Sequence, residues 1–171
     1  MFLLDEKAHL YFSVLGRALY TAQHLEMNCR AIVGFIHIRL SVMGSGSEVL
    51  DSPELLSQIE QLWKKTLGQN IRILKDYNFF DENLMRILEE ATDARNEIAH
   101  KVTMGIDERT DFESINIFDD IKPLIRKIAT ADKFISGLLH FLNREPLPTP
   151  HYFKYYENQV TDWVLAPASF H

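Results

Sequence analysis

The sequence predicts an all-α protein, a helical bundle of about four main helices followed by an extended aromatic C-terminal tail. Every long stretch repeats its apolar residues at helical spacing, and no run of residues is typical of a strand. The chain has 171 residues, of which 46% are hydrophobic, and no shift in composition suggests a second core. We therefore expect one bundle over residues 1–143, with a Pro-rich linker and an aromatic tail over residues 144–171.

The first helix is expected from about Asp5 to Met43, with a bend or break near Gly34, and the run Gly44 to Ser47 is typical of a helix end. Its apolar residues fall in one stripe when each residue is turned by about 100°. This stripe consists of Leu15, Ala18, Leu19, Ala22, Leu25, Cys29, Val33, Ile36 and Leu40. Glu26 falls near its middle, so a carboxylate is expected on the core face.

Two further helices are expected over residues 53–75 and about 82–105. Ser52 is typical of an N-cap because its hydroxyl can accept from a free backbone N–H, and Pro53 suits the first helical position. Asp81 is the expected cap of the next helix. Its apolar stripe consists of Leu84, Ile87, Leu88, Ala91, Ile98 and Val102.

The last long helix should follow a polar connection at residues 107–116. Pro123 fits only the first turn of a helix, so Asp119 or Asp120 is expected as the cap. Three prolines within residues 144–150 indicate an extended linker. The aromatic tail beyond it is too apolar for a disordered segment, and we expect it to pack on the bundle or on a partner subunit, with base stacking on RNA as the alternative.

Arg95 falls close to the centre of the apolar stripe of its helix. Burying a guanidinium or a carboxylate without a partner costs several kcal/mol, and pairing the two removes most of that cost. Since Glu26 has the same kind of position on the first helix, we predict an ion pair between Glu26 and Arg95, flanked by Gln23. An ion pair that only fixes the register of two helices is the alternative for these residues.

Asn96 and His100 lie on the opposite, polar face of the same helix. They are four residues apart and are therefore neighbours on that face. Arg95 and His100 are five apart, which separates them by roughly 140° around a straight helix. A site that uses both side chains must therefore be composite, built with a second helix or a second copy of the chain.

The string Arg95-Asn96-x-x-x-His100 resembles the R-x4-6-H signature of the HEPN superfamily (higher eukaryote and prokaryote nucleotide-binding domain), in the RNxxxH form common among its ribonuclease members. The run from Gly16 to Glu26 is similar to the Ala-Gln-x-x-Glu style of first helix in several members. These proteins are small helical bundles of about this length. The resemblance implies a homodimer whose motif helices meet at a shared cleft, with RNA as its substrate.

The resemblance implies metal-independent RNA cleavage that leaves 2′,3′-cyclic phosphate and 5′-hydroxyl ends. His100 suits proton transfer near neutral pH, and the planar charged fork of Arg95 suits the phosphate oxygens. Asn96 could orient the imidazole or the phosphate, and Glu26 would hold Arg95 in position. The implied biological role is that of a toxin or an antiviral defence effector.

One feature departs from part of the family. Members controlled by a nucleotidyltransferase antitoxin often carry a tyrosine after the histidine, as in HxY, whereas this chain has Lys101 and Val102. A modification-based antitoxin is therefore not inferred, although a protein antitoxin or regulator stays a candidate partner. The alternatives are a non-catalytic HEPN-like scaffold for dimerisation or RNA binding, and an immunity or regulatory partner of another protein.

The net charge of -6 argues against a surface that attracts nucleic acid over its whole extent, so any RNA contact must be local. Lys101 and Arg86 are the candidate RNA contacts within the motif helix. A solvated helix face is the alternative for them and for the further cations Lys64, Lys65, Arg72 and Lys75.

Neither a metal nor a cofactor is expected. The histidines other than His100 lack zinc-ligand spacing, and no glycine-rich phosphate loop or serine nucleophile elbow is present. The lone Cys29 excludes an internal disulfide and suggests a reducing compartment. The N-terminus lacks the layout of a signal peptide and the apolar run 31–38 is too short for a membrane span, so a cytoplasmic protein is expected.

Overall fold

The computed structural model describes residues 6–103 and 117–166, and these residues form six α-helices, a short 3-10 helix and no strand. The expected all-α class is therefore confirmed for the described residues, with six helices in place of about four. The elements are α1 (Glu6–Ser45), η1 (Ser47–Asp51), α2 (Pro53–Trp63), α3 (Leu67–Asp76), α4 (Glu82–Thr103), α5 (Ile117–Leu142) and α6 (Pro150–Leu165).

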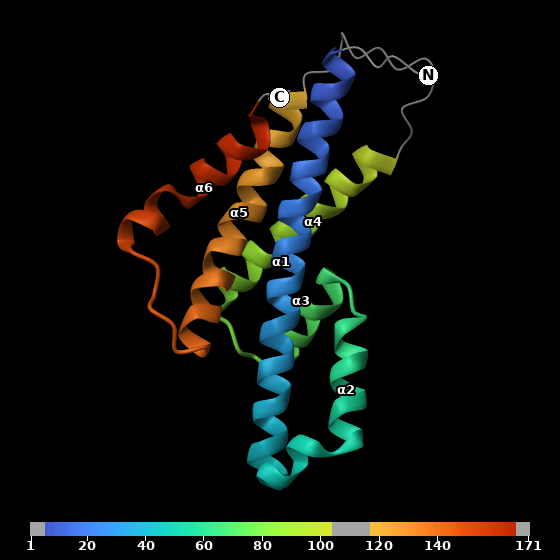
Figure 1. Ribbon diagram of the computed structural model, residues 1–171, viewed down its shortest axis with the longest axis vertical. Coiled ribbons are helices and arrows are strands. Elements are labelled where there is room, and N and C mark those ends of the chain that lie inside the picture. Colours follow the sequence, from blue (N-terminus) through green and yellow to red (C-terminus); the bar gives the residue numbers. More distant parts are fainter. Residues whose placement is uncertain (1–5, 104–116, 167–171) are drawn as a thin grey trace.

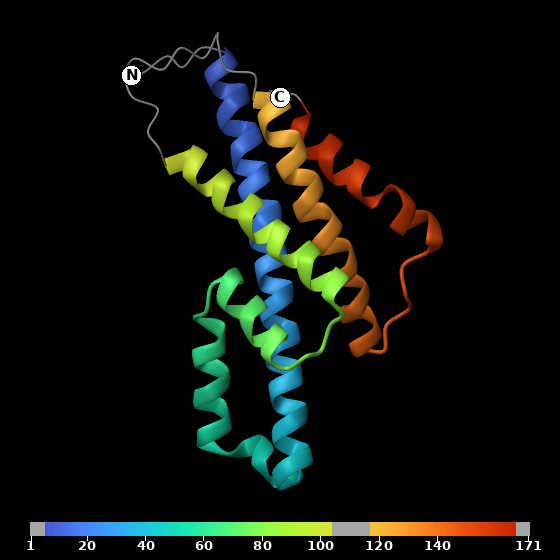
Figure 2. The ribbon, with the colours of Figure 1, turned by 180° about the vertical axis from the view of Figure 1, so that it is seen from behind.

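Helix α1 runs through the length of the molecule and contacts every other helix (Figure 1). Helices α2 and α3 pack against its second half, and α5 packs against its first half, with α6 on the outer side of α5. Seen from behind, α4 crosses α1 obliquely beside α5 (Figure 2). None of the helices in the described ranges combines the length and the apolar character that a membrane span requires.

Helix α1 is continuous through Gly34, so the expected break does not occur. Gly34 is buried within this continuous helix. Most of the predicted core stripe is buried, but Leu40 is 49% exposed. The last turns of α1 extend beyond the end of α5, beside α2 (Figure 1). Leu40 lines a cavity there with Phe79 and Phe141 instead of packing in the core.

The helix expected over residues 53–75 is divided into α2 and α3. Thr66 begins α3 with a capping box, in which its hydroxyl accepts from the Gln69 backbone and the Gln69 side chain accepts from the Thr66 backbone. These two reciprocal bonds satisfy backbone N–H groups that a helix start leaves free. The Thr-x-x-Gln spacing was visible in the sequence and was missed.

The start of α4 agrees with the sequence analysis, whereas the start of α5 does not. The Asp81 carboxylate accepts from the Leu84 backbone N–H at 2.8 Å, as expected of an N-cap. Helix α5 begins at Ile117, so Asp119 and Asp120 lie in its first turn, and Pro123 lies inside the helix. The polar connection 107–116 and Val102's side chain lie outside the described residues.

The tail expected to be extended forms α6. Thr149 caps this helix through a bond from the Tyr152 backbone N–H at 3.2 Å, and Pro150 occupies its first turn. Ser52 and Pro53 make the same arrangement at the start of α2. Helix α6 packs mainly on α5 and also contacts α1, so these aromatic residues belong to the bundle of one chain.

Two glycines within helices allow a test of how tightly α6 packs. A Cβ at Gly16 would meet nothing within 4 Å, whereas one at Gly137 would lie 3.0 Å from the Phe153 ring. Because alanine is the better helix former, Gly16→Ala should raise the free energy of unfolding by about 0.5–1 kcal/mol. Gly137→Ala should gain less than Gly16→Ala because the Phe153 ring must move. Urea denaturation measures both, and equal gains would contradict the close contact between α5 and α6.

Candidate functional site

The motif residues occupy two sides of α4. Ala91, Ala94 and Ile98 are buried, while Asn96 and His100 are exposed on the other side, as the helical spacing predicted. Arg95 extends from the packed side toward α1, and its side chain is 34% exposed. It is less buried than expected, because a long side chain can cover apolar surface with its stem and keep its charged end at the edge.

The predicted contact between Glu26 and Arg95 is present. The Nη2 atom of Arg95 lies 3.4 Å from Oε2 of Glu26, and the Glu26 side chain is only 11% exposed. The contact joins α1 to α4 across 69 residues of sequence. It places a guanidinium at the edge of the interface between these two helices, with part of its surface open to solvent.

A second arginine also pairs with Glu26 and was not predicted. Arg30 donates from Nη2 to Oε1 of Glu26 and from Nε to the Lys65 carbonyl at 3.0 Å. The spacing of four residues between Glu26 and Arg30 is typical of helical ion pairs and could have shown this contact in the sequence. Glu26, Arg30 and Arg95 are called the Glu26 cluster below.

The Glu26 cluster carries one net positive charge, because two guanidinium groups face one carboxylate. Its position is fixed by α3 as well, since Asn70 donates to the same Lys65 carbonyl at 3.3 Å that Arg30 uses. Asn70 is fully buried, and its Oδ1 has no partner among the described residues. Helices α1, α3 and α4 therefore hold the cluster together.

Two of the predicted site residues flank the cluster on its exposed side. Asn96 accepts from Nη1 of Arg95 at 3.4 Å. Gln23 is exposed. Within the described residues, Glu26 accepts from Arg30 and Arg95, and Arg95 donates to Glu26 and Asn96. Gln23 therefore lies near the cluster along α1 without bonding to it.

The two candidate RNA contacts are balanced by nearby carboxylates. Arg86 lies 2.7 Å from Glu90, and Lys101 lies 3.6 Å from both Glu97 and Asp120. These partners lower the local positive potential on α4. Arg30 and Arg95, which share one carboxylate, are therefore the stronger source of positive charge near the motif.

A cavity of about 270 Å³ lies between α3 and α4 on the polar side of α4. Its lining includes Arg72 and Lys75 from α3 and Glu89 and Asp93 from α4, with Lys75 and Glu89 paired at 2.8 Å. Asp93 lies one helical turn before Asn96, so the cavity opens beside the motif face. The two positive and two negative side chains of this lining sum to zero charge. Lys75 pairs with Glu89, whereas Arg72 has no ion-pair partner in the described part of the chain.

The described residues offer no group of three or more His, Cys, Asp or Glu side chains that could hold a metal ion. The motif itself supplies an imidazole, a carboxamide and a guanidinium. No family model, no curated protein and no solved structure matches the chain. A functional assignment must consequently come from this geometry and from the motif.

The burial of Glu26 gives a prediction for stability. Glu26→Gln leaves two guanidinium groups without their anion and should lower the free energy of unfolding by about 1–3 kcal/mol. Glu60→Gln is the matched control. Glu60 pairs with Lys64 four residues later, as Glu26 pairs with Arg30, but its side chain is 71% exposed, so this change should leave the free energy of unfolding unaltered. Equal effects in urea denaturation would show that the Glu26 cluster is no more than a surface ion pair.

Proposed function

We propose that this protein is a metal-independent endoribonuclease of HEPN type that acts as a homodimer. The observation that carries the proposal is the position of Arg95, which Glu26 holds at the edge of the α1–α4 contact with part of its guanidinium exposed. Asn96 and His100 are exposed on the same helix. The resemblance of Arg95-Asn96-x-x-x-His100 to the HEPN signature supplies the type of reaction.

In this proposal Arg95 stabilises negative charge on the phosphate during cleavage. Its contact with Glu26 uses one nitrogen and is long, at 3.4 Å, so other N–H groups can donate to phosphate oxygens. The net positive charge of the Glu26 cluster favours an anion there, although the chain as a whole carries a net charge of -6. Glu26 and Arg30 act as positioning residues for Arg95.

His100 is the group that transfers protons. One imidazole takes the proton of the 2′-hydroxyl, and an imidazolium on the other side of the phosphorus protonates the departing 5′-oxygen. The products are a 2′,3′-cyclic phosphate and a 5′-hydroxyl, so no water and no metal enters the step. Asn96, one turn before His100, orients the imidazole or the phosphate.

The dimer follows from the number of motif residues and their angular spacing. One chain supplies one motif histidine, whereas acid and base must stand on opposite sides of the phosphate. A straight helix also separates Arg95 and His100 by roughly 140°. A second copy with its α4 facing the first supplies the second histidine and lets the arginine of one chain approach the histidine of the other.

RNA cleavage in EDTA tests the catalytic assignment. The parent protein should cut total RNA to 2′,3′-cyclic phosphate ends, and His100→Ala should slow cleavage by roughly 10²–10⁴-fold, the usual contribution of a general acid or base. Arg95→Ala should also lose activity. His151→Ala is the control because His151 is an exposed histidine on α6, far along the chain from the motif, and it should cleave at the parental rate.

If the parent and His100→Ala cleave equally, His100 is not catalytic and the mechanism is wrong. If neither cleaves while the dimer forms, the chain is a HEPN-like scaffold for dimerisation or RNA binding and the enzyme proposal fails. End mapping of the products separates this reaction from contamination by a metal-dependent nuclease, which leaves different ends and stops in EDTA.

The mass in solution tests the shared site. Light scattering coupled to size-exclusion chromatography should give twice the mass of the 19.9 kDa chain. Adding an excess of His100→Ala chains to the parent should lower its activity, because a mixed dimer contains one motif imidazole where the reaction needs two. A strictly monomeric active protein, or a parent whose activity is unaffected after subunit exchange with His100→Ala, would contradict a shared site.

A further inference from the structure

A second polar cluster lies on the other side of α1, where α1, α5 and α6 meet. Its centre is Asp132 of α5, which is only 1% exposed. The Asp132 carboxylate accepts from three side chains: Nδ1 of His24 at 3.2 Å, Nδ2 of Asn28 at 3.0 Å and the Tyr156 hydroxyl. A buried carboxylate with three donors is fully satisfied, and it fixes the orientation of each donor.

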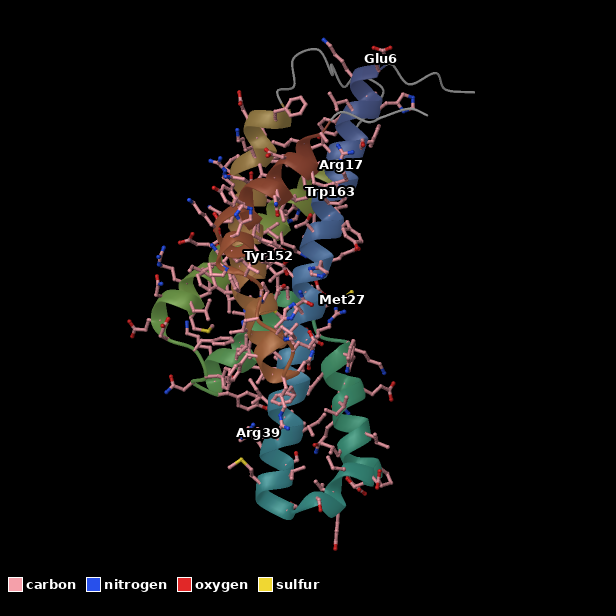
Figure 3. The ribbon with its side chains drawn as sticks, turned by 60° about the vertical axis from the view of Figure 1, so that its left-hand side comes forward. Glu6, Arg17, Met27, Arg39, Tyr152 and Trp163 are labelled. Atoms are coloured by element: carbon pink, nitrogen blue, oxygen red, sulfur yellow. The ribbon has the colours of Figure 1, made fainter. Side chains whose placement is uncertain are left out.

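A cavity of about 270 Å³ opens directly above this carboxylate. Three aromatic residues are part of its walls, and the rings of Tyr20 and Trp163 meet edge to face with their centroids 5.9 Å apart. Figure 3 shows Trp163 beside the first half of α1, close to Arg17. The lining residues are Tyr20, Thr21, His24, Asp132, Tyr156, Val160 and Trp163.

His24 presents one polar atom to this cavity. Its Nδ1 is engaged by Asp132, so the opposite edge of the ring, with Nε2, is the part left for a ligand, and Nε2 has no partner among the described residues. The hydrogen bond that His24 donates to Asp132 raises the pKa of His24, and the negative charge of Asp132 adds to this effect against the opposing effect of burial. The imidazolium form, in which Nε2 donates, is therefore favoured.

The charges around the cavity favour an anion. The Arg17 guanidinium donates to Ser13 and to the carbonyls of Val164 and Ala166, so no carboxylate of the described chain neutralises it. Arg17 and protonated His24 together outweigh the single charge of Asp132. Beside them, Lys133 and Glu157 pair with each other and cancel.

We propose that this cavity binds a small aromatic carboxylate, whose ring packs on Trp163 and Tyr20 while its carboxylate accepts a hydrogen bond from Nε2 of His24. The cavity is at the lower end of the size of ligand sites, which restricts the ligand to one or two fused rings. An aromatic wall with one directed polar group is the usual composition of a specific small-molecule site.

Other uses of this cluster fit the structure less well. The Thr21 hydroxyl donates to the Arg17 carbonyl at 3.0 Å, so it is not activated as a nucleophile by His24. Asp132 is only 1% exposed and its carboxylate already accepts from three side chains, so little of it is open to a cationic ligand. A planar anion needs only the Nε2–H and the aromatic faces, and both are available.

Benzoate and its uncharged analogue benzamide test the proposal. In a Trp63→Phe background Trp163 is the only tryptophan, so its indole N–H gives a single signal in a ¹H–¹⁵N spectrum. Benzoate should shift this signal and the His24 ring signals in a saturable manner, whereas benzamide should bind at least about tenfold more weakly because its carbonyl is a neutral acceptor that forms no ion pair with the imidazolium. No saturable shift with benzoate, or equal affinity for both compounds, overturns the proposal.

His24→Asn separates ligand binding from the structural role of the network. The asparagine amide nitrogen can take the place of Nδ1 on Asp132, but nothing replaces Nε2. This variant should therefore stay folded and lose benzoate affinity about tenfold, with a smaller loss for benzamide, whose neutral carbonyl gains less from the imidazolium. Unchanged benzoate affinity in His24→Asn would show that the imidazole does not hold the carboxylate.

Arg39→Gln is the matched control. Arg39 lies toward the other end of α1 (Figure 3), where it lines a separate cavity of about 360 Å³ together with the aromatic residues Phe35, Phe79 and Phe141. That cavity also combines a guanidinium with aromatic rings, so benzoate could bind there instead. Arg39→Gln should leave the benzoate affinity measured at Trp163 unchanged. If Arg39→Gln abolishes benzoate binding, the ligand occupies the Arg39 cavity and the proposal is overturned.

The affinity for benzoate should also fall as the pH rises through the raised pKa of His24, because neutral His24 with its proton on Nδ1 has no N–H at Nε2. The other groups near His24 are the Asp132 carboxylate, the Arg17 guanidinium and two tyrosines. Burial raises the pKa of Tyr152 and of Tyr156, so both tyrosines stay neutral. An affinity that does not change with pH while the His24 ring titrates would contradict the contact.

Discussion

Helix α1 constrains the whole molecule because it contacts every other helix and carries polar groups on two opposite sides. Glu26 faces α3 and α4, where it meets Arg95 of α4 beside Arg30 from its own helix, and His24 faces α5 and α6, where it meets Asp132. Two residues along a helix are separated by a rotation of about 200° about its axis. One rotation of α1 therefore allows both the Glu26–Arg95 and the His24–Asp132 contacts, and a small change in that rotation would break both.

These buried polar groups serve specificity more than stability. Removing two charges from water costs several kcal/mol, and their attraction returns about that amount when the geometry is good. The apolar core supplies the favourable free energy, mainly through the buried faces of α1, α4 and α5. Because Glu26 and Asp132 each accept from more than one helix, alternative packings of the same apolar faces are disfavoured.

The sequence was sufficient for features that depend on local spacing. The helical class, most of the core stripe of α1, the Asp81 cap and the exposed face with Asn96 and His100 all follow from periodicity and cap chemistry. The Glu26–Arg95 contact was also predictable, since each charge fell in the apolar stripe of its helix and the two charges have opposite signs. The two caps at Thr66 and Thr149 had local signals as well and were missed.

Features that depend on distant packing could not be predicted in the same way. His24 and Asp132 are 108 residues apart, and nothing in their spacing reveals that α6 adds the Tyr156 hydroxyl to the same carboxylate. The exposure of Leu40 likewise depends on where α5 ends, which is a property of the bundle. A single sequence shows which face of each helix is apolar. Which helix packs on that face depends on the arrangement of all the helices.

The Glu26 cluster also bears on whether Arg95 is structural or functional. Arg30 already neutralises Glu26 at close range from the next turn of the same helix, so electroneutrality does not require Arg95. The longer contact of Arg95 adds a second positive charge at a place that is one third exposed. An unneeded cation of this kind in an acidic protein lowers stability by its own desolvation unless an anion joins it. A phosphate between α4 helices would be that anion, which makes the second arginine more consistent with a binding role than with a purely structural one.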